Sequence, residues 1–538
     1  MQQDLKSQNQ TNDASKRSAL KKHKIPQFEQ KNDIICVSKA IGMRTHKVSE
    51  DQLGLVEVLS SYIDQELKVV HRLDKETSGL ILFARNPTTA ARIAHEFENN
   101  RVEKKYLFLS AKKNQNDFFC MESHIEKNEH QFINNPNKEN NSKTKFVYLE
   151  KVNNYYLYQA EPISGKSHQI RLHAELAGIP ILGDLEHNGN SWFRLALHSS
   201  EISFYLENEH YQFKIPTPHS FYSNESELIL LFENAWQSLN SIYQIENDSC
   251  YRLIHTSRFK LQADIYGSVL WVYWYENQPI TDSQFSDLLD FAKSIHRHLI
   301  VRHMINRGHG VGLVEQQMIQ ASDGTPQNWI ATENGIQYQL KQNSGFSPGL
   351  FLDQCDNRFW VYQNSKNKTV LNLFSYTSGF SVAATAGEAE QVTSVDASTS
   401  FLEWSKENYK INGLNPELAE FFNQDSLLFL NGAKKRNRKW DLIICDPPSF
   451  GRTKTTTWKI EKDLPELALL LSECLSVKGQ ILFTCNYEKW NVSELEQNFF
   501  KKVDRRKYKI QSLPTTGLDF DFPDAYQNLT KGFIVNCC

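Results

Sequence analysis

Two short stretches of the sequence bring together residue types that can act on a substrate. The first is His71-Arg72-Leu73-Asp74, closed by Thr77-Ser78-Gly79 and flanked by the apolar residues Val69-Val70 and Ile81-Leu82-Phe83. A carboxylate held on a rigid turn beside an arginine can take a proton or attack an electrophilic carbon. From this stretch alone, an Asp-Arg turn on the surface is an equally good interpretation.

The second stretch is Asp446-Pro447-Pro448-Ser449-Phe450, which follows an apolar run that is typical of a strand. Ligands bind at the carboxyl ends of strands in open α/β sheets. Further polar residues follow predicted strands in the same region, namely Asn372, Ser375, Thr377, Asp396 and Asp425. An acid that ends a strand, such as Asp396, can accept both ribose hydroxyls of a nucleoside. The sequence has no G-x-G-x-x-G word here, which argues against hydride transfer.

The elements that must position these residues differ between the two halves of the chain. Strands at residues 370–374 and 391–395 alternate with helices at residues 380–386 and from residue 400 onward. This alternation predicts a parallel sheet covered by helices. The first half instead alternates short apolar runs with turns. Between the two regions, apolar residues at helical spacing predict an amphipathic helix at residues 282–297.

Composition limits the possible functions. The chain has 538 residues with 40% hydrophobic and 12% aromatic residues, which predicts several globular domains. Its nine cysteines form no CxxC pair, so neither a metal site nor a disulfide framework is predicted. The N-terminus has no secretory signal, and the most apolar run, residues 268–275, is too short to span a membrane. We therefore expect a cytoplasmic protein without a membrane partner.

The net charge of −3 is unusual for a protein that binds nucleic acid. Phosphate contacts, however, need only one basic face. Lys and Arg do cluster at residues 16–24, 434–439 and 501–507. Charge therefore neither predicts nor excludes an RNA partner.

Three ordered words in the first half resemble the RluA-type pseudouridine synthases. They are HRLD-x-x-TSG at residues 71–79, Lys104-Lys105-Tyr106, and GKSHQIRLH at residues 165–173. The resemblance implies that Asp74 is the catalytic aspartate, that Arg171 pairs with it, and that Tyr106 stacks on the flipped uracil. It also implies that Arg72 fills the space that the flipped base leaves. The early word departs from the family, because Lys39-Ala40-Ile41-Gly42 lacks the usual proline.

The second half resembles the class I methyltransferases of 23S ribosomal RNA, specifically the RlmI and RlmK groups. The matching words are GLFLDQ at residues 349–354, LNLFSYT at 371–377, SVD at 394–396 and DPPSF at 446–450. The resemblance implies S-adenosylmethionine as the cofactor, whereas the pseudouridine synthase half needs none. Its methionine end would lie near Asn372, Ser375 and Thr377, its ribose at Asp396 and its adenine at Asp425, with Asp446 bordering the methyl-transfer pocket. Cys355 stands where the family usually has an arginine.

The methylated atom is left open by the sequence. Methylation at C5 of cytosine requires a thiolate beside the base, whereas N7 of guanine already carries a lone pair. Cys485 resembles the cysteine of one RlmI-like word, but its strand equally resembles an RlmK word, and Ser449 occupies the other usual cysteine position. We consider the two atoms almost equally compatible, with a slight preference for guanine N7.

The combined interpretation is a bifunctional RNA-modifying enzyme that acts on RNA, with 23S rRNA favoured, tRNA also possible and no obligate protein partner inferred. The alternatives are that one half is an inactive RNA-binding module, or that the methyltransferase acts on a protein or an adenine amino group. The expected order is a disordered tail (1–27), an α+β pseudouridine synthase domain (28–225), a linker (226–250), a small central α/β domain that positions RNA (251–345) and an α/β Rossmann-like methyltransferase domain (346–538).

Overall fold

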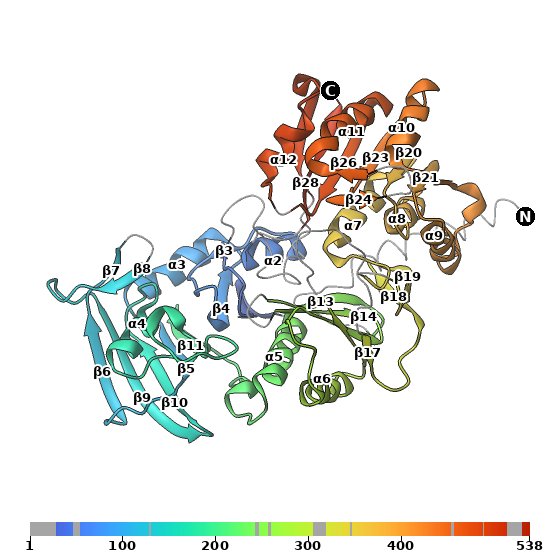
Figure 1. The fold of residues 1–538 in the computed structure, drawn as a ribbon. Coiled ribbons are helices and arrows are strands. Elements are labelled where there is room, and N and C mark those ends of the chain that lie inside the picture. The colour runs from blue at the N-terminus through green and yellow to red at the C-terminus, as the bar shows by residue number, and fades with distance from the viewer. Residues whose placement is uncertain are drawn as a thin grey trace, which may run out of the picture.

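The computed structural model describes residues 28–46, 54–128, 131–242, 247–256, 260–304, 319–344, 347–452, 457–487, 489–513 and 530–537. The tail predicted at residues 1–27 lies outside these residues. Three units follow one another along the chain, in blue to cyan, green, and yellow to red (Figure 1). Within the described part, no helix has the length and apolar character needed to cross a membrane.

The first unit is built on a large, mostly antiparallel sheet. Its strands are β1 (Glu29–Lys31), β2 (Ile34–Lys39), β3 (Lys68–Val69), β4 (Ser78–Ala84), β5 (Glu103–Ser110), β6 (Phe118–Ser123), β9 (Ser142–Val152), β10 (Tyr155–Pro162), β11 (Leu197–Leu206) and β12 (Glu209–Lys214). They are ordered β1-β2-β4-β11-β5-β10-β9-β6, with β3 beside β4 and β12 beside β11. The contact between β4 and β11 is parallel. This pairing places the start of β4, a few residues after Asp74, next to β11, whose other neighbour in the sheet is β5.

Helices and a short ribbon complete the first unit. They are α2 (Leu55–Ile63), α3 (Pro87–Glu98), α4 (Gln169–Leu176), the 3-10 turns η1 (Leu185–His187) and η2 (His219–Phe221), and the β7 (Ile125–Asn128) and β8 (Gln131–Asn134) ribbon. Asn86 caps α3 by accepting a hydrogen bond from the Thr89 amide, and Pro87 suits the first helical position. A mixed arrangement of sheet and helices agrees with the predicted α+β class.

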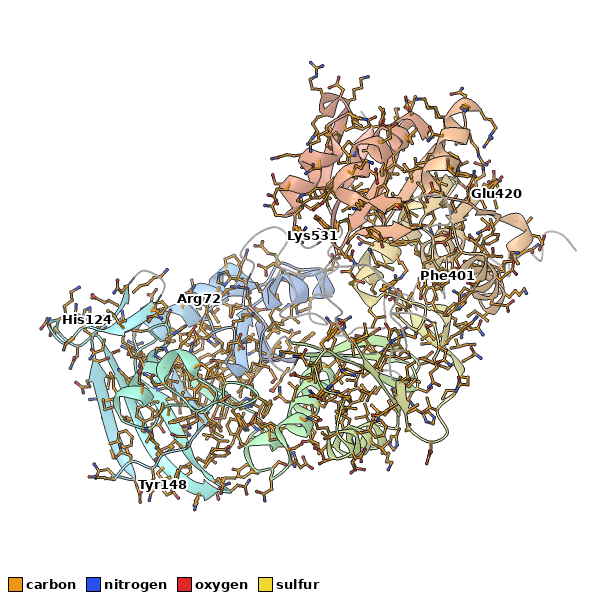
Figure 2. All side chains as sticks on the ribbon, in the orientation of Figure 1. Arg72, His124, Tyr148, Phe401, Glu420 and Lys531 are labelled. Atoms are coloured by element: carbon orange, nitrogen blue, oxygen red, sulfur yellow. The ribbon has the colours of Figure 1, made fainter. Side chains whose placement is uncertain are left out.

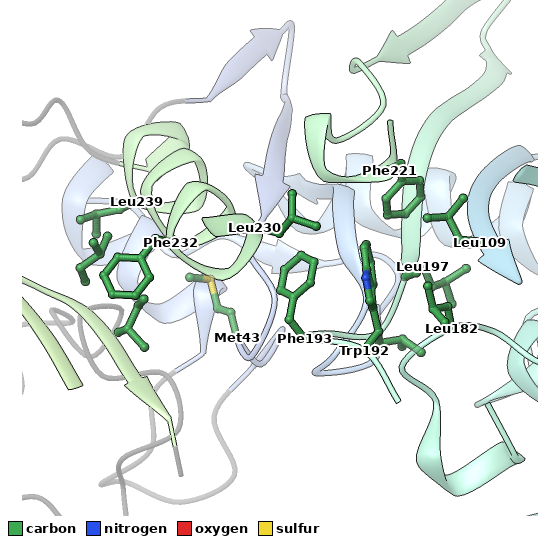
Figure 3. Packing of buried hydrophobic residues seen from close by; sticks show 14 of the residues in the cluster. Met43, Leu109, Leu182, Trp192, Phe193, Leu197, Phe221, Leu230, Phe232 and Leu239 are labelled. Atoms are coloured by element: carbon green, nitrogen blue, oxygen red, sulfur yellow. The ribbon is translucent and has the colours of Figure 1, made fainter. Parts of the chain in front are cut away.

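The segment predicted as a linker contains a long helix, α5 (Glu227–Ile242). Its Leu230, Phe232 and Leu239 are buried in one hydrophobic cluster with Met43 and Phe193 of the first unit (Figure 3). The cluster continues into the second unit, where Phe232 packs edge-on against Phe291. Residues 227–242 therefore belong to the folded core that joins the two units.

The second unit contains a mixed sheet in the order β13-β14-β15-β16-β17 and a separate β18–β19 hairpin. Its elements are β13 (Cys250–Thr256), β14 (Leu261–Tyr266), β15 (Val269–Trp274), α6 (Asp282–Ser294), β16 (His298–His303), β17 (Ile319–Ala321), β18 (Asn328–Glu333) and β19 (Ile336–Lys341). All residues of β15 are buried, as expected for the apolar run at 268–275. Thr281 caps α6, and the predicted helix at 282–297 ends three residues early.

The third unit is a sheet with strand order β22-β21-β20-β23-β26-β28-β27. Its elements are η3 (Leu352–Gln354), α7 (Cys355–Asn364), β20 (Thr369–Leu373), α8 (Gly379–Ala386), β21 (Gln391–Asp396), α9 (Thr399–Ile411), η4 (Pro416–Leu418), β22 (Glu420–Asn423), α10 (Ser426–Lys435), β23 (Trp440–Cys445), β24 (Phe450–Arg452), β25 (Thr457–Lys459), α11 (Ile460–Cys474), β26 (Leu475–Cys485), α12 (Val492–Phe499), η5 (Arg505–Lys507), β27 (Tyr508–Ser512) and β28 (Lys531–Cys537).

The strands β22, β21, β20, β23 and β26 run parallel, which confirms the predicted βαβ alternation. Their carboxyl ends therefore share one edge of the sheet, and the polar residues that follow β20, β21 and β23 meet there.

Two candidate active sites

The four residues predicted for the first site line one cavity of about 1090 Å³. Asp74 and Arg72 lie on the turn between β3 and β4, Tyr106 lies on β5, and Arg171 lies on α4. Figure 2 labels Arg72 on the upper side of the first unit. The sequence words thus converge on one cavity, although they lie up to a hundred residues apart.

A buried lysine holds the turn that carries Asp74. The Lys39 side chain is fully buried, and its ammonium donates hydrogen bonds to the carbonyls of Ala40, Met43 and Lys75 at 3.0, 2.9 and 2.9 Å. Burial lowers the pKa of Lys39 to about 7, although the negative charges of Glu76 and Asp74 act to raise it. Sequence reasoning considered this segment only for its missing proline and missed the lysine.

Tyr106 is almost completely buried beside the catalytic turn. Burial raises its pKa well above the usual range, the charge of Asp74 raises it further, and a hydrogen bond with Ser199 opposes the shift. The phenol therefore stays protonated and presents an uncharged aromatic ring to the cavity, as stacking on a base requires.

Arg171 is paired differently from the prediction. Its guanidinium donates to both carboxylate oxygens of Asp184, at 2.7 and 2.6 Å, and to Glu186 at 2.8 Å. Asp74 makes no ion pair with Arg171 in the described structure, so the predicted Arg171–Asp74 pair is corrected. Burial by itself would lower the pKa of Arg171. The hydrogen bonds and negative charge of Asp184, with smaller contributions from the charges of Asp74 and Glu186, raise it above its usual value. Asp74 therefore interacts with Arg171 through its charge and not through a hydrogen bond.

Basic side chains surround the cavity despite the acidic balance of the whole chain. The lining includes Arg44, Arg72, Lys75, Lys104, Lys166 and Arg171, against the acids Asp74 and Glu98. Burial lowers the pKa of Lys104 to about 8. A concave surface with this excess of positive charge attracts a phosphate backbone.

The second site is a small cavity of about 40 Å³ at the carboxyl edge of the third sheet. Asn372, Ser375, Thr377 and Asp446, all predicted from sequence, line it. The hydroxyl of Ser375 is buried without a hydrogen-bond partner, so it is available to a ligand. The structure brings these four residues together as the strand-end argument predicts.

The loop between β20 and α8 has an unusual backbone. Phe374, Tyr376 and Ser378 all have φ between 50° and 60°, a conformation that residues other than glycine rarely adopt. Amide groups in such a loop and at the following helix start can receive a carboxylate. The loop and the unpaired Ser375 hydroxyl fit the methionine end of S-adenosylmethionine.

Asp396 and Asp425 occupy strand ends but do not line this small cavity. Asp396 accepts hydrogen bonds from the amides of Tyr376 and Ser398, at 2.9 and 2.8 Å, and burial raises its pKa. Asp425 caps α10 by accepting from the Leu427 and Leu428 amides. Asp396 is therefore anchored next to the cavity loop, whereas the observed hydrogen bonds of Asp425 are those of a helix cap.

Asp446 lies in a buried polar network. It accepts hydrogen bonds from Gln354 Nε2 at 2.9 Å and from the Thr484 hydroxyl at 2.8 Å, and Asn357 donates to Gln354 at 2.6 Å. Burial raises the pKa of Asp446 to about 6, and the charge of Asp353 acts in the same direction. Sequence reasoning named Asp446 but missed Gln354, whose only signal was its place in the GLFLDQ word.

Cys485, predicted as a possible nucleophile, lies at the end of β26 and is fully buried in the hydrophobic cluster of the third unit. Burial raises its pKa to about 12, and Asp446 adds to the shift while Lys531 opposes it. Its sulfur accepts a hydrogen bond from the Tyr487 amide at 3.2 Å. Cys485 does not line the second cavity, and its thiol stays protonated near neutral pH.

The second unit fixes the cavity wall formed by residues 349–351. The Tyr266 hydroxyl of β14 donates to the Leu350 carbonyl at 2.9 Å, and Arg358 donates to the Phe351 carbonyl at 2.7 Å. Arg358 is in turn held by Glu333 of β18 through two hydrogen bonds of 2.7 Å. Both charged side chains are about 5% exposed. This wall therefore depends on elements outside the methyltransferase sheet.

Two family models match the chain. Residues 33–176 match the model described as RNA pseudouridylate synthase, and residues 264–495 match the one described as S-adenosylmethionine-dependent methyltransferase. The first match contains the predicted residues Arg72, Asp74, Tyr106 and Arg171. The second contains the predicted cofactor residues and Cys485.

The chain is also similar to parts of known proteins. A Ribosomal RNA large subunit methyltransferase K/L from Shewanella oneidensis is 31% identical over 250 residues, which are 46% of this chain and 33% of that protein. The protein of the same name from Pseudoalteromonas atlantica is 38% identical over 192 residues, 35% of this chain and 26% of that protein. The chain thus spans a third or less of the length of these relatives. The solved structure of Human RNA Pseudouridylate Synthase Domain Containing 1 is 24% identical, with a TM-score of 0.32, over 37% of this chain and 85% of that one.

Proposed function

Because this chain joins a pseudouridine synthase domain to an S-adenosylmethionine-dependent methyltransferase domain, we propose that it is a bifunctional RNA-modifying enzyme. It isomerises a uridine in its first unit and methylates a base with its third unit. The convergence of Arg72, Asp74, Tyr106 and Arg171 on one basic cavity carries the proposal for the first activity.

In the first unit, Asp74 is the residue that acts on the uridine. Isomerisation breaks the N1–C1′ bond, turns the base and rejoins it through C5, for which one carboxylate in a desolvated pocket suffices. Tyr106, with its phenol protonated and uncharged, stacks on the base. Arg72 fills the space that the base vacates. Arg171, anchored by Asp184, presents its positive charge to the cavity that Asp74 lines.

In the third unit, S-adenosylmethionine supplies an electrophilic methyl group when it is bound. Ser375 and the amides of its loop would hold the carboxylate end, with Asn372 and Thr377 beside them, and Asp396 would bind the ribose hydroxyls. We assign Asp425 to the adenine end, in addition to its role as the α10 cap. Gln354 and Thr484 orient Asp446 at the border of the methyl-transfer pocket.

The methylated atom in this proposal is N7 of guanine. Attack on C6 of cytosine needs a thiolate near the base, and the pKa of Cys485 is raised to about 12 by burial. N7 would need no enzyme nucleophile, because it already carries a lone pair that can accept a methyl group. Cys485 is then a packing residue of β26.

The substrate we propose is 23S rRNA, which places the enzyme in the cytoplasm. The names of the relatives, ribosomal RNA large subunit methyltransferase K/L, support this choice. The second unit, between the two catalytic units in the chain, serves as a small α/β domain that positions RNA.

Mapping rRNA and tRNA modifications by mass spectrometry in a strain that lacks the gene tests the proposal. We expect one pseudouridine and one 7-methylguanosine to disappear from 23S rRNA and to return with the wild-type gene. Complementation with Asp74→Asn should restore only the methylated base. Unchanged rRNA in the deletion strain, or losses confined to tRNA, would contradict the proposed substrate.

A further inference from the structure

Two histidines and a glutamate meet at the rim of the first cavity. His168 precedes α4, and Glu186 and His187 lie on η1. The Nδ1 atom of His168 is 3.3 Å from Nε2 of His187 and 3.7 Å from Oε2 of Glu186. All three ligand atoms lie within 4.8 Å of one another. None of the three belongs to the catalytic residues proposed above.

These separations suit a tetrahedral transition-metal site. Zinc binds histidine nitrogen and carboxylate oxygen at about 2.0–2.2 Å, so two tetrahedral ligands lie about 3.3–3.5 Å apart. Two histidines and one glutamate are a ligand set that zinc takes in proteins, with water at the fourth position. The Glu186 carboxylate is exposed, so it can move closer to both histidines when a metal ion binds.

A carboxylate outside the cluster, that of Glu175, contacts the ring nitrogen of His187 that faces away from His168. Oε2 of Glu175 lies 3.2 Å from Nδ1 of His187, on the opposite side of the ring from His168. Histidines that bind metals commonly donate their other ring nitrogen to a carboxylate, which fixes the tautomer and orients the ring. The Glu175 contact therefore leaves the ring lone pair of His187 on Nε2, the atom that faces Nδ1 of His168.

Among the residues that the structure describes, Arg171 is the positive group in direct contact with the cluster. Its Nη2 donates to Glu186 at 2.8 Å, and its Nη1 lies 3.2 Å from both ring nitrogens of His168. Two hydrogen bonds to Asp184 hold the guanidinium independently. A metal ion can therefore replace the contacts of Arg171 to the cluster, while Asp184 keeps its charge balanced.

We propose that His168, Glu186 and His187 form a binding site for Zn²⁺ or a similar divalent transition metal at the rim of the uridine cavity. Because His168 and Arg171 both line that cavity, an occupied site changes its wall. Zn²⁺ is then an inhibitor of pseudouridine formation.

Equilibrium dialysis of the full chain against Zn²⁺ tests the site without any assay of activity. Wild type should bind one equivalent more than His187→Ala, whereas His210→Ala, a change at an exposed histidine of β12, should match wild type. Glu175→Gln should keep the equivalent but weaken its affinity about 10–100-fold, the usual effect of losing such a supporting carboxylate. Co²⁺ in the site should show the visible absorption of tetrahedral coordination, absent from His187→Ala.

If wild type and His187→Ala bind the same number of Zn²⁺ ions, the proposed site is wrong. The same stabilisation by S-adenosylmethionine in both proteins would show that the variant is folded. The inhibition rests on the proposed function and has its own test. Zn²⁺ should slow pseudouridine formation by wild type and spare His187→Ala. A bound equivalent without inhibition would overturn the inhibitory role and leave the metal site standing.

Discussion

Replacing Glu333 with glutamine tests whether the second unit fixes the wall of the methyltransferase cavity. The Glu333–Arg358 pair is about 5% exposed and makes two hydrogen bonds of 2.7 Å. Glu333→Gln removes the negative charge at nearly constant volume and leaves the Arg358 charge uncompensated in the interior. Breaking a buried ion pair from one side costs about 3–5 kcal/mol. At about 2–4 °C per kcal/mol for a folding unit of this size, Tm should fall by about 6–20 °C.

The assay is thermal unfolding of the full chain, followed through the transition that S-adenosylmethionine shifts upward. Cofactor affinity should fall as well, because Arg358 also holds the Phe351 carbonyl of the cavity wall. Glu466→Gln is the matched control, since the Lys502–Glu466 pair is about half exposed and such pairs contribute about 0–1 kcal/mol. A fall in Tm no larger than that of the control, with cofactor affinity unchanged, would refute the reasoning.

Three further outcomes are expected. Asp74→Asn should abolish pseudouridine formation in vitro while cofactor binding stays normal, and a normal rate would refute the assignment. Cys485→Ala should retain methylation on rRNA from the deletion strain, whereas complete loss with cofactor binding preserved would indicate a thiolate mechanism. The pKa of Asp446 is raised from 3.8 to about 6, so this carboxyl stabilises the fold fully below about pH 4, and the contribution is lost as pH rises through about 6. The Tm difference between wild type and Asp446→Asn should therefore change across that interval and be constant above pH 7.

The sequence predicts those parts of the sites whose residues are neighbours in the chain or follow successive parallel strands. Arg72 and Asp74 share one turn, so their proximity needs no knowledge of the fold. Asn372 lies near the end of β20, Ser375 follows β20, and Asp446 follows β23, so parallel pairing alone brings them to one sheet edge. The alternation of strands and helices therefore predicted both the third sheet and the cavity at its edge.

Contacts between segments that lie far apart in the sequence could not be predicted in this way. The partner of Arg171 depends on how η1 folds back onto α4. Asp184 belongs to the stretch that resembles the pseudouridine synthases, but nothing in the sequence indicates that Asp184 and Glu186, and not Asp74, bind the guanidinium. Gln354 reaches Asp446 and Thr484 only because η3 packs against the ends of two strands far along the chain.

The helix α5 is a different case, since its sequence does contain a signal. Leu228, Leu231, Phe232, Ala235 and Leu239 follow helical spacing, and nothing in residues 227–242 resembles a flexible linker. One family resemblance ends before this segment and the other begins after it, so neither covers its helical periodicity. A gap between two recognised regions is therefore weak evidence for a linker when the residues inside it are apolar at helical spacing.

Burial has different consequences for Asp446, which lines the second cavity, and for Cys485, which lies in the hydrophobic core of the third unit. Burial raises the pKa of Asp446 to about 6, so this carboxyl is still mostly ionised at neutral pH, whereas the Cys485 thiol, with a pKa of about 12, is not. Methyl transfer to N7 leaves a positive charge on guanine, and a fixed carboxylate in a low-dielectric pocket stabilises that charge as it develops. Methylation at C5 of cytosine would instead require a second anion, the thiolate, close to an existing carboxylate. The electrostatics of the pocket thus favour an uncharged base that becomes cationic.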